Sequence, residues 1–221
     1  MNDLFISVLN MSLTASYVIL FILVIRMFLK KAPKIISYGL WSVAAFRLVF
    51  PFSIESIFSL LPRDTNVSPI PKDIIYQQSP HIKSGIKIVD SVVSNSLPAP
   101  SAGASVNPLQ IYLEAGRFIW ILGILMILIF SLVSVLRLKR QLKVTRLVKK
   151  NIYEVSDLKT PFVLGMIRPK IYLPAGLSDA ERKYILMHEQ IHIERKDHLI
   201  KIFAFLITIV HWFNPMAWVF F

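Results

Sequence analysis

The sequence predicts a mainly α-helical integral membrane protein with three transmembrane helices, a C-terminal apolar or re-entrant segment, and a small cytoplasmic α+β portion. The first observation is composition: 55% of the 221 residues are hydrophobic and 17% are charged, whereas about a quarter of an average globular domain is charged. The second is a set of apolar runs as long as the roughly 20 residues that cross a bilayer. The third is that clusters of Lys and Arg follow two of these runs, which is typical of cytoplasmic helix ends.

The N-terminal apolar run, residues 4–25, predicts the first transmembrane helix. A secretory signal peptide is the competing interpretation. However, the start "MND" contains no basic residue, and the run leads into "RMFLKK" rather than into a small-residue cleavage site. The basic cluster marks the cytoplasmic end of this helix, so we expect the N-terminus to lie outside the cell.

A second helix is expected to begin near Ile35 and to end near Leu61, so that residues 1–61 hold two N-terminal transmembrane helices. This helix carries Arg47, and a charge at membrane depth is costly unless it is paired or reaches the interface. Pro51 indicates that the helix is ending there. We therefore interpret Arg47 as a residue near the outer interface, with a functional role as the alternative.

Residues 62–108 are expected to form an extracellular loop, because Pro, Ser and Asn recur and "LPAPSAGASVNP" has no helical period. It contains at most a short strand or helix around 81–93. Residues 109–136 then predict the third transmembrane helix, which ends in a basic stretch at residues 137–150. Glu114 and Arg117 are one helical turn apart at its outer end, a spacing that favours an ion pair.

The cytoplasmic segment, residues 137–198, is expected to contain a basic helix, two or three short strands and one further helix. Runs rich in β-formers alternate there with Pro, Gly and Asp. In "LSDAERKYILMHEQIHIERKDHL", Ser178 is the expected N-cap, and Glu181 follows three residues later, as in a capping box.

The stretch "MHEQIHIERKDH" carries the candidate chemistry. His188 and His192 lie four residues apart, so both imidazoles lie on one helix face and can bind one zinc ion, with Glu189 as the general base of a metallopeptidase. Because the chain contains no cysteine, a metal must be held by His, Asp or Glu. A surface helix with two chance histidines is the alternative. The preceding strands offer an edge for an extended substrate, at Phe162, Val163, Leu164 and Gly165.

Three ordered segments, "TPFVLGMIRPKIYLP", "ERKYILMHEQIHIERKDHL" and "HWFNPMAW", resemble the BlaR/MecR family of β-lactam sensor-transducers, which are membrane-embedded zinc peptidases. The second apolar segment is also similar to that family's second transmembrane helix. The resemblance implies a cytoplasmic gluzincin-like site, with His188 and His192 as zinc ligands and Glu189 as the base. It also implies activation through an external sensor domain and proteolysis that leads to inactivation of a DNA-bound repressor.

The resemblance implies a third zinc ligand, a glutamate on a helix after "WFNP", which this sequence does not reach. Among residues present, Glu194 lies roughly on the opposite side of the helix from His192. Asp197 is better placed for a hydrogen bond behind the metal or for a helix-end salt bridge. His211 is the best internal candidate, although an interfacial pair with Trp212 is the more economical interpretation.

Residues 199–221 are apolar but broken by "HWFNP", which favours a re-entrant or surface-lying hairpin, with a plain fourth span as the alternative. The leading hypothesis is a multi-pass plasma-membrane zinc metallopeptidase that cleaves a cytoplasmic protein, such as a repressor, or itself. A truncated, inactive fragment that acts by association is the alternative. Direct nucleic-acid binding is not expected, since aromatic stacking residues and a recognition motif are absent. The basic stretch instead suits anionic lipid headgroups.

Overall fold

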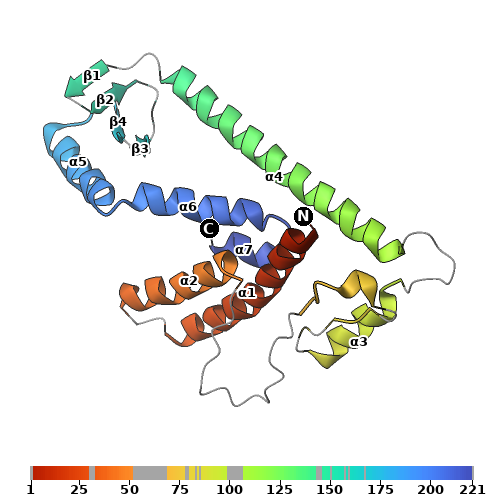
Figure 1. The fold of residues 1–221 in the computed structure, drawn as a ribbon. Coiled ribbons are helices and arrows are strands. Elements are labelled where there is room, and N and C mark those ends of the chain that lie inside the picture. Colours follow the sequence, from red (N-terminus) through yellow and green to blue (C-terminus); the bar gives the residue numbers. More distant parts are fainter. Residues whose placement is uncertain are drawn as a thin grey trace. The chain divides into compact units, whose positions relative to one another are not determined.

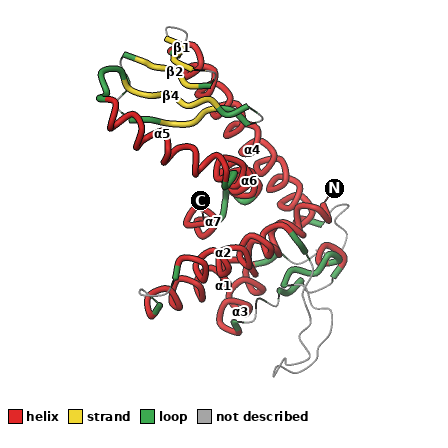
Figure 2. The backbone as a smooth tube through the Cα atoms, turned by 90° about the vertical axis from the view of Figure 1, so that its left-hand side faces the viewer, coloured by secondary structure: helices red, strands yellow, loops and turns green. Residues whose placement is uncertain are grey.

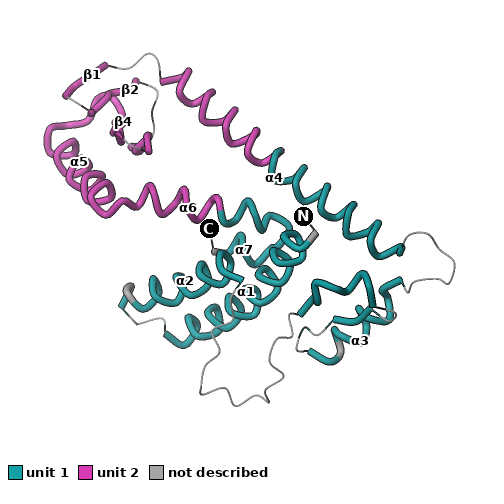
Figure 3. Tube along the Cα trace, in the orientation of Figure 1, with its two compact units in different colours: residues 1–125, 207–221 teal, residues 126–206 magenta. Residues whose placement is uncertain are grey.

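The structure is a computed structural model, and it is mainly helical with one small sheet (Figure 1). The chain divides into two compact units, residues 1–125 with 207–221 and residues 126–206 (Figure 3). The structure describes residues 2–29, 33–51, 69–77, 80–82, 84, 86–98, 107–142, 146–149, 151–156, 158, 160–166 and 168–220.

In the first unit, α1 (Asn2–Phe28) packs against α2 (Lys34–Val49). Ala15 and Ala44 are both 0% exposed at this contact, and such small side chains let two helix backbones approach closely. Leu48 of α2 is buried in a cluster with Ala15. The C-terminal segment of the chain packs against this helix pair.

Two helices in the described part of the chain are long and apolar enough to cross a membrane, within Asp3–Phe28 and Pro108–Gln141. The latter is α4, whose 34 residues extend about 50 Å at the ordinary helical rise, beyond the roughly 30 Å of a hydrocarbon core. In its N-terminal part, Glu114 and Arg117 form the expected ion pair, with 3.9 Å between Arg117 Nη2 and Glu114 Oε2. The two spans support the membrane assignment.

The expected second span is shorter in the structure. Helix α2 has 16 residues and ends at Val49, where Phe50 is extended with φ of −109°. An extended residue is favoured before a proline, so the prediction that the helix ends near Pro51 is confirmed. Residues 52–61 of the expected span lie outside the described residues, and this third membrane crossing stays a prediction.

The segment between α2 and α4, predicted to be extracellular, is connected to both long helices by asparagine side chains. It contains the short 3-10 helix η1 (Ile74–Tyr76) and α3 (Lys87–Ser96), consistent with the short element expected near 81–93. Asn10 of α1 exchanges two hydrogen bonds with the backbone of Ile70, at 2.9 and 2.8 Å. Asn107, before α4, donates to the Ile75 carbonyl at 2.6 Å. The parts 62–68, 78–79 and 99–106 of the predicted loop lie outside the described residues.

The second unit contains a four-stranded sheet in the order β1-β2-β4-β3. Its strands are β1 (Arg146–Lys149), β2 (Ile152–Val155), β3 (Phe162–Leu164) and β4 (Lys170–Pro174), and only the β2/β4 pair is parallel. Figure 2 shows α5 alongside this sheet. The predicted strands after the basic stretch are present as β2, β3 and β4. The prediction missed β1, which forms inside the basic stretch by pairing with β2.

One face of the sheet packs against α5 (Asp179–Glu194) through buried Ile171 and Leu173. The predicted capping box begins this helix: Ser178 Oγ accepts from the Glu181 backbone N–H, and the Ser178 N–H donates to Glu181 Oε2 at 3.0 Å. This cap fixes where α5 starts and so which residues of the histidine motif share a face.

The single helix expected over residues 178–199 is in fact two helices. α5 ends at Glu194 and α6 (Asp197–Val210) begins after Lys196, whose φ of +58° lies in the left-handed region. A left-handed residue cannot continue a right-handed helix and costs about 1–2 kcal/mol outside glycine. The chain therefore changes direction just after the histidine motif.

The "HWFNP" turn joins α6 to α7 (Pro215–Phe220) and is hydrogen-bonded to neighbouring helices in the first unit. Asn214 Nδ2 donates to the hydroxyls of Ser12 and Ser16, each at 2.8 Å. Trp212 Nε1 donates to the Trp120 carbonyl of α4 at 3.2 Å. The C-terminal segment is thus a helix, a turn and a short helix. The re-entrant or surface-lying hairpin and its alternative, a fourth span, both stay predictions.

Candidate metal centre

The two motif histidines lie side by side on α5. His188 Nε2 and His192 Nε2 are 3.2 Å apart, and their ring planes cross at 79°. Two nitrogens bound to one tetrahedral zinc at ordinary Zn–N lengths are about 3.3 Å apart. The ring geometry therefore fits two ligands of one zinc ion without rearrangement of the helix.

Asp197 sets the protonation pattern of the second histidine. Its Oδ2 lies 2.6 Å from His192 Nδ1, and because a carboxylate only accepts, the proton is on Nδ1. The lone pair of neutral His192 is then on Nε2, the atom that faces His188. A carboxylate behind a ligating histidine fixes its ring orientation and raises its basicity. Asp197 thus accepts a hydrogen bond from the candidate ligand His192 and forms a helix-end salt bridge with Arg195, whose Nε lies 3.6 Å from Asp197 Oδ1.

The helix break at Lys196 makes this pair possible. On a continuous α-helix, a residue five positions ahead points roughly 140° away, so Asp197 could not reach the His192 ring. The left-handed Lys196 redirects the chain, and α6 begins with the Asp197 carboxylate beside His192. The left-handed backbone at Lys196 therefore places the carboxylate of Asp197 beside the candidate ligand His192.

Glu189 lies on the wall of a groove between α5, the start of α6 and β3. The β3 side is formed by Phe162 and Val163, two of the predicted substrate-strand residues. Strand β3 pairs only with β4 and is an edge of the sheet, so it can add an extended peptide as a further strand. Leu164 ends β3, and Gly165 follows with φ of +121°, a conformation that favours glycine.

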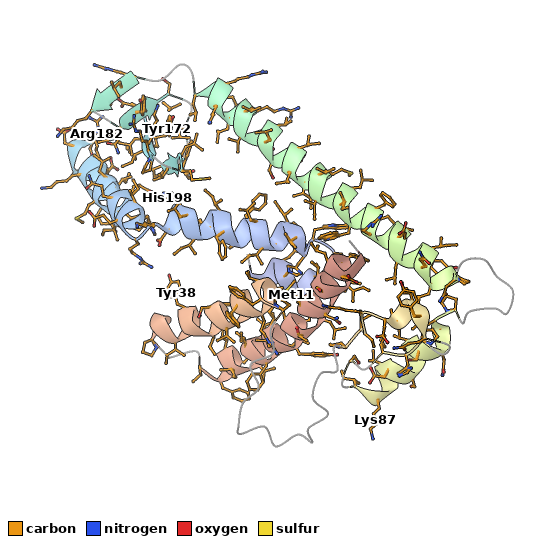
Figure 4. The ribbon with its side chains drawn as sticks, in the orientation of Figure 1. Met11, Tyr38, Lys87, Tyr172, Arg182 and His198 are labelled. Atoms are coloured by element: carbon orange, nitrogen blue, oxygen red, sulfur yellow. The ribbon has the colours of Figure 1, made fainter. Side chains whose placement is uncertain are left out.

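The groove also includes residues that sequence analysis passed over. His198, labelled in Figure 4 at the start of α6, lines it together with Lys201. His198 Nε2 lies 3.3 Å from the Met166 carbonyl, just after β3, and so ties α6 to the end of that strand. The four-residue spacing of Asp197 and Lys201 could have indicated from the sequence that Lys201 lies near the site, since it places both side chains on one helix face.

No group of three His, Asp or Glu side chains able to hold one metal ion occurs in the part of the chain that the structure describes. Glu194 is exposed at the last residue of α5. His211 is 1% exposed in the first unit, where its Nε2 donates to the Leu48 carbonyl at 2.8 Å. The hydrogen-bond partner of His211 Nε2 is therefore the Leu48 carbonyl rather than Trp212.

The chain is similar to known membrane regulators. The family model described as BlaR1 peptidase M56 matches residues 6–221. The "Regulatory protein BlaR1" of Bacillus licheniformis is 37% identical over 123 residues, which cover 45% of this chain and 20% of that protein. The "Methicillin resistance mecR1 protein" of Staphylococcus aureus is 28% identical over 68 residues, which cover 29% of this chain and 12% of the relative. The matched segments thus span no more than a fifth of these relatives.

Proposed function

The chain belongs to the BlaR1 peptidase M56 family, and on that premise we propose that it is the zinc metallopeptidase part of a membrane signal transducer. We propose further that it hydrolyses a peptide bond in a cytoplasmic protein or in its own chain. The observation that carries the proposal is the 3.2 Å separation of His188 Nε2 and His192 Nε2. That separation matches two ligands of one tetrahedral zinc ion.

The residues around the histidines have complementary tasks. Zinc, when bound by His188 and His192, supplies Lewis-acid activation of a water nucleophile. Glu189 accepts the proton of that water at its carboxylate and later donates it to the leaving amine. Asp197 holds the His192 ring in the tautomer that leaves Nε2 free.

Substrate positioning is the task of the β3 edge. An extended peptide that pairs with Phe162–Leu164 would lie in the groove that Glu189 lines. Main-chain hydrogen bonds would then set its register, and the groove walls would select its side chains. This arrangement suits endopeptidase cleavage in an extended segment of a protein substrate.

The regulatory part of the proposal is supported by the relatives. One is titled a regulatory protein and the other a methicillin resistance protein, and both similarities fall on a chain with two apolar helices long enough to span a membrane. A cytoplasmic repressor is the substrate that such a role favours. We place the site on the cytoplasmic side because the positive-inside rule assigns the basic end of α4 to the cytoplasm.

A non-catalytic role is the second candidate function. It is favoured by the absence, among the described residues, of a group of three His, Asp or Glu side chains that could hold one metal ion. In this alternative the chain binds zinc weakly and acts only by association with other proteins.

Zinc content and hydrolysis together test the proposal. The purified chain in lipid nanodiscs is compared with Glu189→Ala and His192→Ala variants, and with Glu194→Ala as a matched control at an exposed position of the same helix. We expect zinc in the wild type, Glu189→Ala and Glu194→Ala, but little in His192→Ala. Cleavage of a candidate repressor should survive only in wild type and Glu194→Ala. Substoichiometric zinc without hydrolysis in the wild type would support the non-catalytic alternative.

A further inference from the structure

Among the described residues that line the groove, Lys201 is the one lysine. It lies on α6, one helical turn after Asp197, and its side chain is exposed. An aspartate four residues before a lysine is ordinarily its ion-pair partner on a helix. The groove is therefore lined by an exposed lysine as well as by the candidate catalytic residue Glu189.

The expected partner of Lys201 is already engaged. Asp197 Oδ2 accepts from His192 at 2.6 Å, and Asp197 Oδ1 lies 3.6 Å from Arg195 Nε. Salt bridges in the described part of the chain do not include Lys201. The arrangement that orients His192 thus leaves the neighbouring ammonium group available to a ligand in the groove.

The other basic side chains of the groove are committed to contacts within the chain. His192 bonds to Asp197, and His198 lies against the Met166 carbonyl. The facing wall is apolar, with Phe162 and Val163 of β3. An extended peptide on β3 alternates its side chains between two sides, so it can present one polar group toward α6.

We propose that Lys201 is a specificity-determining residue, which binds a carboxylate of the peptide that lies along β3. This inference rests on the proposed peptidase function and names its substrate class: peptides with an acidic group close to the scissile bond. The carboxylate comes from an Asp or Glu side chain or from a free C-terminus, since both offer the same two acceptor oxygens to an ammonium group.

Peptide binding tests the inference separately from catalysis. The full chain in neutral-lipid nanodiscs carries Glu189→Ala, so that bound peptides are not cleaved. Fluorescently labelled peptides differ only by Glu or Gln at one scanned position, and each is made with a free and an amidated C-terminus. Lys201→Ala and Lys201→Glu are compared with Lys183→Ala, an exposed lysine of α5 that does not line the groove.

We expect acidic peptides to bind about two- to fivefold more tightly than neutral ones, as suits an exposed ion pair. The preference should shrink as salt is raised, vanish in Lys201→Ala, reverse toward Lys-containing peptides in Lys201→Glu, and persist in Lys183→Ala. Loss of the preference on amidation alone would identify a chain terminus as the ligand. Loss on Glu→Gln exchange would identify a side chain.

The inference would be overturned if neither the Glu→Gln exchange nor C-terminal amidation changed binding, if none of the peptides bound, or if the preference survived Lys201→Ala. It also fails if Lys201→Ala weakens only binding to anionic vesicles, because Lys201 would then be a lipid contact. Acidic-peptide preference without zinc-dependent hydrolysis in the Glu189-containing chain would instead refute the peptidase proposal alone.

Discussion

Gly123 is the position at which one added methyl group should most clearly disturb the packing of the first unit, residues 1–125 with 207–221. It lies in α4, where a Cβ would overlap the indole of Trp212. That indole donates to the Trp120 carbonyl at 3.2 Å, and Trp120 Nε1 donates to the Val210 carbonyl at 2.8 Å. Gly123→Ala must therefore move the "HWFNP" turn away from α4 or bend the helix.

The expected cost has two parts. Overpacking by one methyl group in a close contact costs about 1–3 kcal/mol. Weakening the hydrogen bonds of Trp120 and Trp212 adds about 0.6 kcal/mol each at membrane depth. We expect Gly123→Ala to lower the free energy of unfolding by about 2–4 kcal/mol.

Gly39 of α2 provides a matched control, since a Cβ there meets nothing within 4 Å. Gly39→Ala should be neutral or stabilising by up to about 1 kcal/mol, because alanine is the better helix former. Equilibrium unfolding in mixed micelles, followed by tryptophan fluorescence, measures both variants. If Gly123→Ala unfolds within 0.5 kcal/mol of Gly39→Ala, on the order of surface substitutions, the close contact with Trp212 is wrong. In that case, adding Trp212→Ala to Gly123→Ala should also fail to restore any free energy of unfolding.

The remaining predictions concern metal affinity, pH and the C-terminal turn. Asp197→Ala should weaken zinc binding about 10- to 100-fold by freeing the His192 ring, measured by competition with a chromophoric chelator; unchanged affinity would refute the orienting role. Hydrogen bonds from Ser178 hold the pKa of the Glu181 carboxylate below its ordinary value. The contribution of Glu181 to the helix cap is therefore complete above the unfolded-state pKa. It is lost as pH falls through the lower folded-state pKa. Amide exchange in the first turn of α5 should accelerate in that acidic window in the wild type, whereas Glu181→Gln should show no such pH step. Asn214→Ala should lower unfolding free energy by about 1–2 kcal/mol because it leaves two α1 hydroxyls without their donor; a melting temperature equal to wild type would contradict this.

Most of the candidate site could be predicted from local sequence patterns. The capping box at Ser178 needs only a serine and a glutamate three residues apart, and the histidine pair needs only helical periodicity. Both features depend on neighbours within one turn, so the sequence was sufficient. The end of α2 before Pro51 follows in the same way from the restriction that proline imposes on the preceding residue.

Features that depend on strand pairing, on a backbone bend or on a distant partner, rather than on helical periodicity, were not predictable. Strand β1 forms in a basic stretch because Leu147 pairs with Tyr153 of β2, and tertiary pairing of this kind overrides local propensity. The bend at Lys196 has no glycine or proline to announce it. His211 resembled a ligand in sequence, yet its ring bonds to a carbonyl 163 positions away.

The bend between α5 and α6 links metal binding to backbone geometry. Asp197 reaches His192 only because Lys196 is left-handed, so the bent state should bind zinc more tightly than a straightened one. Thermodynamic reciprocity then requires zinc to favour the bend by the same factor. A force that straightens the α5–α6 junction would release metal, and a bound ion would resist that force. If zinc binds as proposed, metal occupancy and the angle between α5 and α6 would be two readouts of one equilibrium.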